Sequence, residues 1–186
     1  MKPSFTALIT LASVALAAPA HHKDAKPYTL AATKTNSFGL LDKPLNAVDG
    51  LLWVNMAIHP FCPVPAPATP CPTSNLTSFT TTHDRTDLNS VVSGQHVFIS
   101  ADGIVKFTDP SQTVPSDATV KGVKDILVGG TRTWLCNLES GEDAYYAVVA
   151  KNETALPAQA DGQNTCARAV FVATEIEKGA TAYQYE

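Results

Sequence analysis

The sequence predicts an all-β protein, a compact antiparallel sandwich or barrel of about eight short strands stapled by disulfide bonds. Short runs rich in Val, Ile, Thr, Tyr and Phe are bounded by Gly, Pro, Asn and Asp, which is typical of strands. No window shows a sustained 3.6-residue period with helix caps. The 186 residues are 45% hydrophobic and 16% charged, so one domain of ordinary size can bury a core.

The N-terminus has the pattern of a secretory signal peptide. Lys2 precedes an apolar run over residues 5–16, and Ala15-Leu16-Ala17 is a small-x-small cleavage site. The run is too short to span a bilayer. We therefore expect residues 1–17 to be removed, with cleavage after Ala18 or Ala20 as the alternatives.

The remaining chain is expected to form one domain. We interpret residues 18–35 as a polar N-terminal tail and residues 36–186 as a single β domain. Residues 60–82 are expected to form a Pro/Thr-rich surface loop, because proline fixes φ and removes a hydrogen-bond donor. This segment could be a recognition loop or a stiff connection, and we prefer the stiff connection. No further apolar run of membrane length follows, and the polar C-terminal sequence lacks the hydrophobic tail of a GPI anchor.

The strands are expected where β-branched and aromatic residues gather between turn residues. Asp102-Gly103 separates two such runs and predicts a β-hairpin with a type I′ turn, and Gly129-Gly130 predicts another turn. The expected strands are Ser37–Leu41, Leu51–Ile58, Gln95–Ser100, Ile104–Thr108, Thr119–Val128, Thr131–Cys136, Ala144–Lys151, Cys166–Ile176 and Thr181–Tyr185.

Four cysteines in an exported chain predict two disulfide bonds, for which three pairings are possible. We favour Cys62–Cys71 and Cys136–Cys166, because each pair closes a local loop. A zinc site is the alternative, but the chain has no CxxC or HxxxH spacing.

Two sequons predict N-glycosylation on surface loops: Asn75-Leu76-Thr77 and Asn152-Glu153-Thr154. The net charge is −4 with neutral histidines, and the basic residues are scattered singly. A nucleic-acid-binding protein needs a basic footprint, so we exclude that class of partner.

No catalytic motif is present, since the sequence has no GxSxG, HExxH, P-loop or Rossmann fingerprint. We therefore predict no catalytic residues and no cofactor. His83-Asp84 and His96 would form a triad only if a serine met them in space. Three acidic residues beside a glycine are expected to form a polar turn rather than a glycosidase pair: Glu139, Glu142 and Asp143.

His21 is the one residue that suggests a metal. Cleavage after Ala20 would expose its imidazole beside the new N-terminal amine, an arrangement that binds Cu(II). Cleavage after Ala18 would give a Pro-Ala-His chelate. We expect cleavage after Ala17 and therefore no metal. The candidate second copper ligands are His59, His83 and His96.

Six aromatic residues suggest a sugar-stacking surface. Each lies within a strand-like run, where half of the side chains face the core, so burial is the expected place of both tryptophans. The six residues are Trp53, Trp134, Tyr145, Tyr146, Tyr183 and Tyr185.

Several short motifs also occur in a fixed order: Phe38–Leu40, Cys62-Pro63, Cys71-Pro72, Gly94–Ile99, Asp102–Ile104, Trp134–Cys136, Ala144–Ala150, Cys166 and Ala182–Tyr185. With this set the chain resembles, over about residues 36–186, a family of small fungal secreted proteins described as IgE-binding-protein-like and related to the cell wall protein of phialide development. Residues 83–90 do not match. The resemblance implies a secreted, wall-associated or antigenic β protein, without catalytic residues to transfer.

We therefore expect a non-enzymatic secreted glycoprotein of the fungal surface or cell wall. Its expected partners are cell-wall polysaccharide or host surface molecules. A carbohydrate-binding, lectin-like effector is the first alternative. A copper oxygenase or a glycosidase is the second, and sequencing of the mature N-terminus would separate it from the others.

Overall fold

The computed structural model describes residues 25–35, 39–58, 60–63, 71–72, 74–137, 145–151, 166–177, 182 and 184–186. The predicted signal peptide over residues 1–17, His21, His59 and the Asn152 sequon lie outside these residues, as do the acidic residues between 139 and 143.

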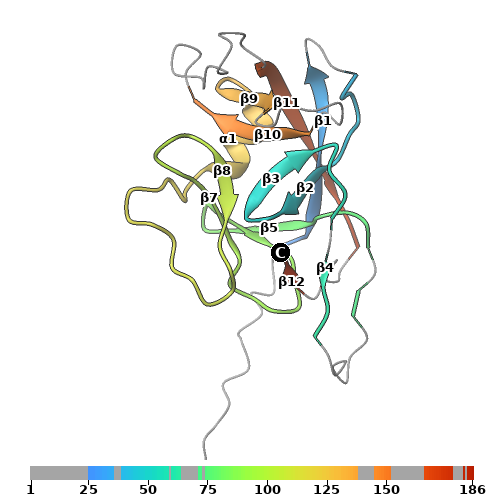
Figure 1. Ribbon diagram of the computed structural model, residues 1–186, viewed down its shortest axis with the longest axis vertical. Helices are drawn as coiled ribbons and strands as arrows, with labels where there is room; N and C mark the ends of the chain where they lie inside the picture. The colour runs from blue at the N-terminus through green and yellow to red at the C-terminus, as the bar shows by residue number, and fades with distance from the viewer. Residues whose placement is uncertain are drawn as a thin grey trace, which may run out of the picture.

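The fold is all-β, as predicted, and the described residues form twelve strands and one short helix (Figure 1). In chain order the elements are β1 (Tyr28–Thr35), β2 (Leu45–Val48), β3 (Leu51–Val54), β4 (Pro60–Phe61), β5 (Phe79–Thr82), β6 (Arg85–Leu88), β7 (His96–Ile99), β8 (Val105–Phe107), α1 (Val123–Gly129), β9 (Thr133–Asn137), β10 (Tyr146–Ala150), β11 (Cys166–Glu175) and β12 (Gln184–Tyr185).

Ten antiparallel strands form one sheet that closes on itself as a barrel. Their order is β10-β9-β11-β1-β5-β6-β7-β8-β3-β2, and β10 also pairs with β3, which closes nine of the strands into a ring with β2 beside β3. Closure removes free edges that would otherwise invite aggregation. β12 and β4 form a separate two-stranded sheet at one end of the barrel (Figure 1).

Along β11 the core follows the two-residue period of a strand, whereas β2, β3, β7 and β10 are buried over consecutive residues. On this strand Ala167, Ala169 and Phe171 are buried, Val170 is half-buried, and Arg168 and Val172 are exposed. Full burial of one large apolar side chain contributes about 1.5–3 kcal/mol. The apolar side chains of the barrel interior therefore supply much of the stability, and one face of every long strand points into this interior.

The predicted polar tail over residues 18–35 is wrong for its second half, because residues 28–35 form β1. Tyr28, Leu30 and Ala32 are buried on this strand, and β1 pairs with β11 from Tyr28↔Glu175 to Thr35↔Ala169. The alternation was hard to see in the sequence because alanine and threonine occupy most other positions. The β domain therefore begins before residue 36.

The predicted strand over Thr119–Val128 is also wrong, since residues 123–129 form helix α1. Val123 and Leu127 lie one turn apart and are both buried. Gly130 ends the helix with φ 62° and donates its backbone N–H to the Ile126 carbonyl, as expected of a glycine C-cap. The sequence signals for this helix are therefore the Val123–Leu127 spacing and the Gly130 cap. They outweigh the β-branched residues of the segment, which favour a strand.

Two further predictions fail locally. The run Ser37–Leu41 contributes no strand among its described residues, because Gly39 and Asp42, both with positive φ, turn the chain between β1 and β2. The predicted loop over residues 60–82 contains β4 at its start and β5 at its end. The other predicted strands correspond to β3, β7, β8, β9, β10, β11 and β12 with shorter bounds.

The type I′ turns lie elsewhere than predicted. Asp49-Gly50 joins β2 to β3 and His83-Asp84 joins β5 to β6, and all four residues have the positive φ that this turn requires. At Asp102-Gly103 the hairpin exists, but only Gly103 of the pair has positive φ. Ser100 donates its backbone N–H to the Ile104 carbonyl, and the three residues between these two have the arrangement of a type I turn followed by a left-handed glycine.

Both disulfide bonds form in the favoured pairing, Cys62–Cys71 and Cys136–Cys166. Cys136 and Cys166 are register partners on β9 and β11, and Cys136 is only 1% exposed. Cys62 follows β4 and is exposed. One bond therefore lies in the barrel wall, and the other ties a surface segment.

Candidate functional site

The C-terminal strand is fixed to the barrel by a buried glutamine. Gln95 donates its side-chain N–H to the Tyr185 carbonyl at 2.8 Å, and its side-chain oxygen accepts the Tyr185 N–H at 3.0 Å. The Tyr185 hydroxyl accepts the Ser78 N–H at 3.2 Å. Gln95 and Tyr185 are both fully buried, so these bonds cannot be exchanged with water without cost.

Beside this strand lies an open cleft of about 570 Å³. The β2–β3 turn, the end of β8 and the C-terminal residues form its walls. Two backbone bonds fix these parts, from Phe107 N–H to Gly50 O at 2.9 Å and from Asp49 N–H to Glu186 O at 2.8 Å. The cleft is lined by Asp49, Gly50, Phe107, Asp109, Gln112, Gln184 and Glu186.

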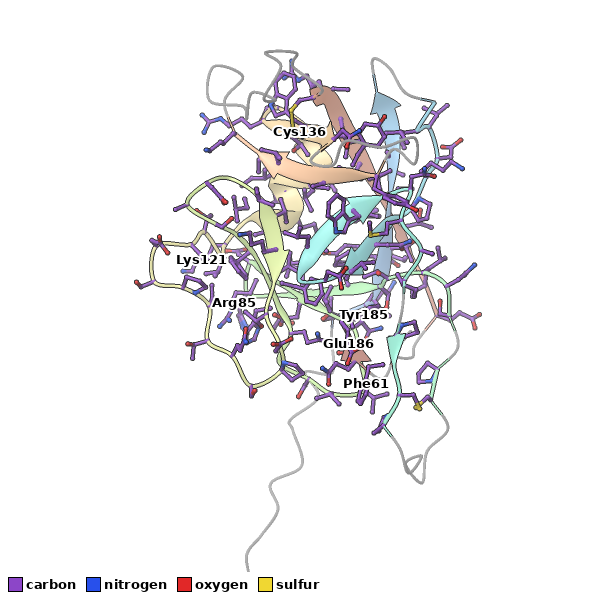
Figure 2. The ribbon with its side chains drawn as sticks, in the orientation of Figure 1. Phe61, Arg85, Lys121, Cys136, Tyr185 and Glu186 are labelled. Carbon is purple, nitrogen blue, oxygen red and sulfur yellow. A yellow bond between two sulfur atoms is a disulfide. The ribbon has the colours of Figure 1, made fainter. Side chains whose placement is uncertain are left out.

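The cleft is polar and acidic in character. Three of its side chains carry carboxylates and two carry carboxamides, while Phe107, 5% exposed, is buried below them. Within the part of the chain that the structure describes, no lysine or arginine lines it. Arg85 and Lys121 lie on another flank of the barrel, left of Glu186 in Figure 2. The carboxylates of the cleft can therefore accept hydrogen bonds from an uncharged polar ligand, and its carboxamides can both accept and donate them.

An exposed aromatic ring lies next to one of the cleft residues. Phe61 on β4 is the register partner of Gln184 on β12, and Pro60 is the partner of Tyr185. Antiparallel partners project from the same face of a sheet, so Phe61 stands beside Gln184, while Tyr185 faces the core. Phe61 is 39% exposed, and it lies below Tyr185 and Glu186 in Figure 2.

A second, smaller cleft of about 290 Å³ lies between β1, β5, α1 and the end of β11. The Tyr28 hydroxyl bonds to the Thr81 hydroxyl at 2.7 Å, and burial raises the pKa of this phenol above its usual value. Lys124 lies 4.4 Å from the centre of the Tyr28 ring, and Lys26 pairs with Glu175 at 3.0 Å. Its charged groups are thus already engaged, Lys26 with Glu175 and Lys124 with the Tyr28 ring.

The candidate histidines are not assembled into a triad. His96 Nδ1 lies 2.6 Å from Asp87 Oδ1, and these two residues are cross-strand partners on β7 and β6. His83 and Asp84 form the turn between β5 and β6 instead. Neither histidine lines either cleft. No group of three or more His, Cys, Asp or Glu residues suited to a metal ion occurs in the described ranges.

The suggested aromatic sugar-stacking surface is largely buried. Trp53 is 4% exposed, as expected of a core residue, and its indole N–H donates to the Val48 carbonyl. Trp134 is half-buried and donates to the Lys151 carbonyl. Tyr146 and Tyr185 are core residues, whereas Tyr183 lies outside the described residues. Three of the six aromatic residues are therefore core residues, and Tyr145, like Trp134, is half-buried.

The Asn75 sequon lies between β4 and β5. Asn75 is exposed, as a glycosylation acceptor must be, and its glycosylation stays a prediction. Thr77, two residues on, is 1% exposed, and its hydroxyl accepts the Ala47 N–H at 2.8 Å. The folded barrel thus displays the asparagine and buries the threonine.

No protein-family profile, no curated protein and no solved structure matches the chain. In the parts of the chain that the structure places, no helix is long and apolar enough to cross a membrane.

Sequence reasoning missed the cleft because most of its residues belong to no motif. Asp49, Asp109 and Gln184 are spread over more than a hundred positions and meet only through strand pairing. Two signals pointed toward it: the Asp49-Gly50 dipeptide, which favours a tight hairpin, and the C-terminal motif that carries Gln184.

Proposed function

We propose that this chain is a non-enzymatic secreted glycoprotein of the fungal surface, associated with the cell wall and antigenic. The observation that carries the proposal is the Cys136–Cys166 bond between β9 and β11, with Cys136 1% exposed. Disulfides form and persist in oxidising compartments. A bond built into the barrel wall is part of the folded structure rather than a transient redox state.

Other features support the same assignment. The N-terminal sequence has the three parts of a signal peptide, and Asn75 is exposed in its sequon. Several motifs behind the fungal family resemblance contain residues that link strands: Gln95 hydrogen-bonds to Tyr185, and Cys136 forms a disulfide bond with Cys166. The resemblance therefore concerns residues that hold the barrel together, and the wall association is inferred from it.

A carbohydrate-binding, lectin-like role is the second candidate, and the cleft beside β12 favours it. Its carboxylate and carboxamide side chains suit hydroxyl-rich ligands. Binding of this kind would retain the protein in the wall without a covalent link. The two candidates are therefore compatible, since one gives the location and the other gives the means of retention.

Fractionation of a fungus producing the chain tests the proposal. Cytosol, membrane, wall and medium are probed with an antibody, because a C-terminal tag would disturb the buried Tyr185. We expect the protein in wall and medium, with a mature N-terminus at Ala18 and a mass reduced by glycosidase treatment. An intracellular protein with an intact N-terminus would contradict the proposal, and a mature start at His21 would support the copper oxygenase instead.

A further inference from the structure

The cleft beside β12 has the volume of a small-molecule site, and hydrogen bonds hold its walls in place. Its volume of about 570 Å³ lies within the range of roughly 300–1,000 Å³ usual for such sites. Its walls are held in place by the Phe107–Gly50 and Asp49–Glu186 backbone bonds and by the two bonds from Gln95 to Tyr185. A ligand would therefore meet a backbone frame that is already in place, which reduces the entropy lost on binding.

The lining selects a ligand rich in hydroxyl groups. Carboxylates accept hydrogen bonds from hydroxyls, and these charge-assisted bonds are stronger than neutral ones. The amides of Gln112 and Gln184 both donate and accept, so they suit hydroxyl and acetamido groups alike. With three carboxylates and no described basic residue in the lining, the cleft repels anionic ligands such as uronic acid polymers.

Phe61 extends the cleft toward a second kind of contact. Its ring is 39% exposed and projects from the same face as Gln184, its partner across β4 and β12. The axial C–H groups of a pyranose ring form an apolar face that packs on an aromatic ring. One sugar bonded to Gln184 would thus place its neighbour against Phe61.

We propose that this cleft binds one neutral oligosaccharide chain. Asp49, Asp109 and Glu186 accept its hydroxyls, Gln112 and Gln184 donate to it, and Phe61 stacks on the adjacent ring. The chain is a neutral hexose or N-acetylhexosamine polymer, since both offer hydroxyls without negative charge. The choice between β-glucan and chitin oligomers rests on the proposed wall location, whereas the site itself rests on the cleft.

Calorimetric titration of the mature chain with laminarihexaose and with chitohexaose tests the inference, with an oligogalacturonate of similar length as the anionic control. We expect saturable binding of at least one neutral hexasaccharide and none of the oligogalacturonate. Asp109→Asn keeps the shape of an exposed side chain and removes its charge, and we expect binding about tenfold weaker. Phe61→Ala should weaken binding about three- to tenfold.

Val172→Ala is the matched control, because Val172 is 44% exposed on β11 and does not line the cleft. It should bind as the unaltered chain does, and unchanged melting temperatures will show that every variant is folded. Absence of binding to both neutral ligands, or binding that Asp109→Asn and Phe61→Ala leave unchanged, would overturn the inference. A wall-located protein that binds neither sugar refutes only the site, and a sugar-binding protein found in the cytosol refutes only the proposed location.

Discussion

Removal of the Cys136–Cys166 bond should destabilise the protein more than removal of the Cys62–Cys71 bond. The cysteines are 30 residues apart in the first pair and 9 in the second. In the chain-entropy model the stabilisation grows with the logarithm of loop length, so the two bonds differ by about 1 kcal/mol on this ground alone.

Burial increases the expected difference. Cys136 is 1% exposed in the barrel wall, so its replacement by alanine removes a buried sulfur and leaves a small void that costs about 1 kcal/mol more. β9 and β11 also pair over only three register positions, one of which is Cys136↔Cys166 itself. Cys62 is exposed, and its loop is already stiffened by proline, so that bond has less freedom to restrict.

The measurement is thermal and urea unfolding of two double variants, Cys62→Ala/Cys71→Ala and Cys136→Ala/Cys166→Ala. A difference of about 2 kcal/mol corresponds to melting temperatures roughly 4–8 °C apart for a domain of this size. The reduced wild-type chain provides the reference for loss of both bonds. Equal losses of unfolding free energy, or a larger loss from Cys62→Ala/Cys71→Ala, would show that neither loop length nor burial determines the contribution of these bonds.

Three further outcomes are expected. Gln95→Ala should lower the unfolding free energy by about 2–4 kcal/mol in urea denaturation, because it removes two buried hydrogen bonds to the Tyr185 backbone. Replacement of the exposed Gln112 by alanine should change the unfolding free energy by less than about 0.5 kcal/mol, and similar losses from the two variants would refute the role of Gln95 in holding the C-terminal strand. Asp84→Gly should stabilise by about 0.5–1 kcal/mol, since Asp84 has φ 64°, and a lower melting temperature would contradict this. Burial raises the pKa of Tyr28 above 10.0, so the folded state favours the protonated phenol; the resulting stability is complete below pH 10 and is lost as the pH rises through the raised value. Tyr28→Phe should make the decline in unfolding free energy between pH 9 and pH 11 shallower, and an identical decline would exclude this contribution.

The sequence predicted the fold class and the disulfide pairing because both depend on local patterns. β-branched runs, turn residues and short cysteine spacings are readable within windows of a few tens of residues. Strand β1 was not predicted because Ala32, although as buried as Leu30, has too small a side chain to reveal the alternation of buried and exposed positions. Helix α1 is hard to predict because β-branched residues fill half of residues 119–128 and favour a strand, although Val123 and Leu127 have helical spacing.

The cleft was beyond this kind of reasoning for a different reason. Asp49 and Asp109 approach one another only because β3 pairs with β8 and Gly50 bonds to Phe107. Gln184 joins them only because the C-terminal strand is seated by Gln95. Such long-range pairings depend on the closure of the whole barrel, which no single segment encodes.

The buried hydroxyl of Thr77 has a consequence for the order of events during biosynthesis. The enzyme that transfers a glycan must bind the threonine of a sequon as well as the asparagine, yet in the folded barrel this hydroxyl bonds to the Ala47 N–H and is 1% exposed. Sugar addition at Asn75 must therefore precede the docking of residues 74–78 against β2. If Asn75 is glycosylated as we propose, the occupancy of its sequon reports how fast this segment docks: slower docking lengthens the interval for modification, and faster docking shortens it.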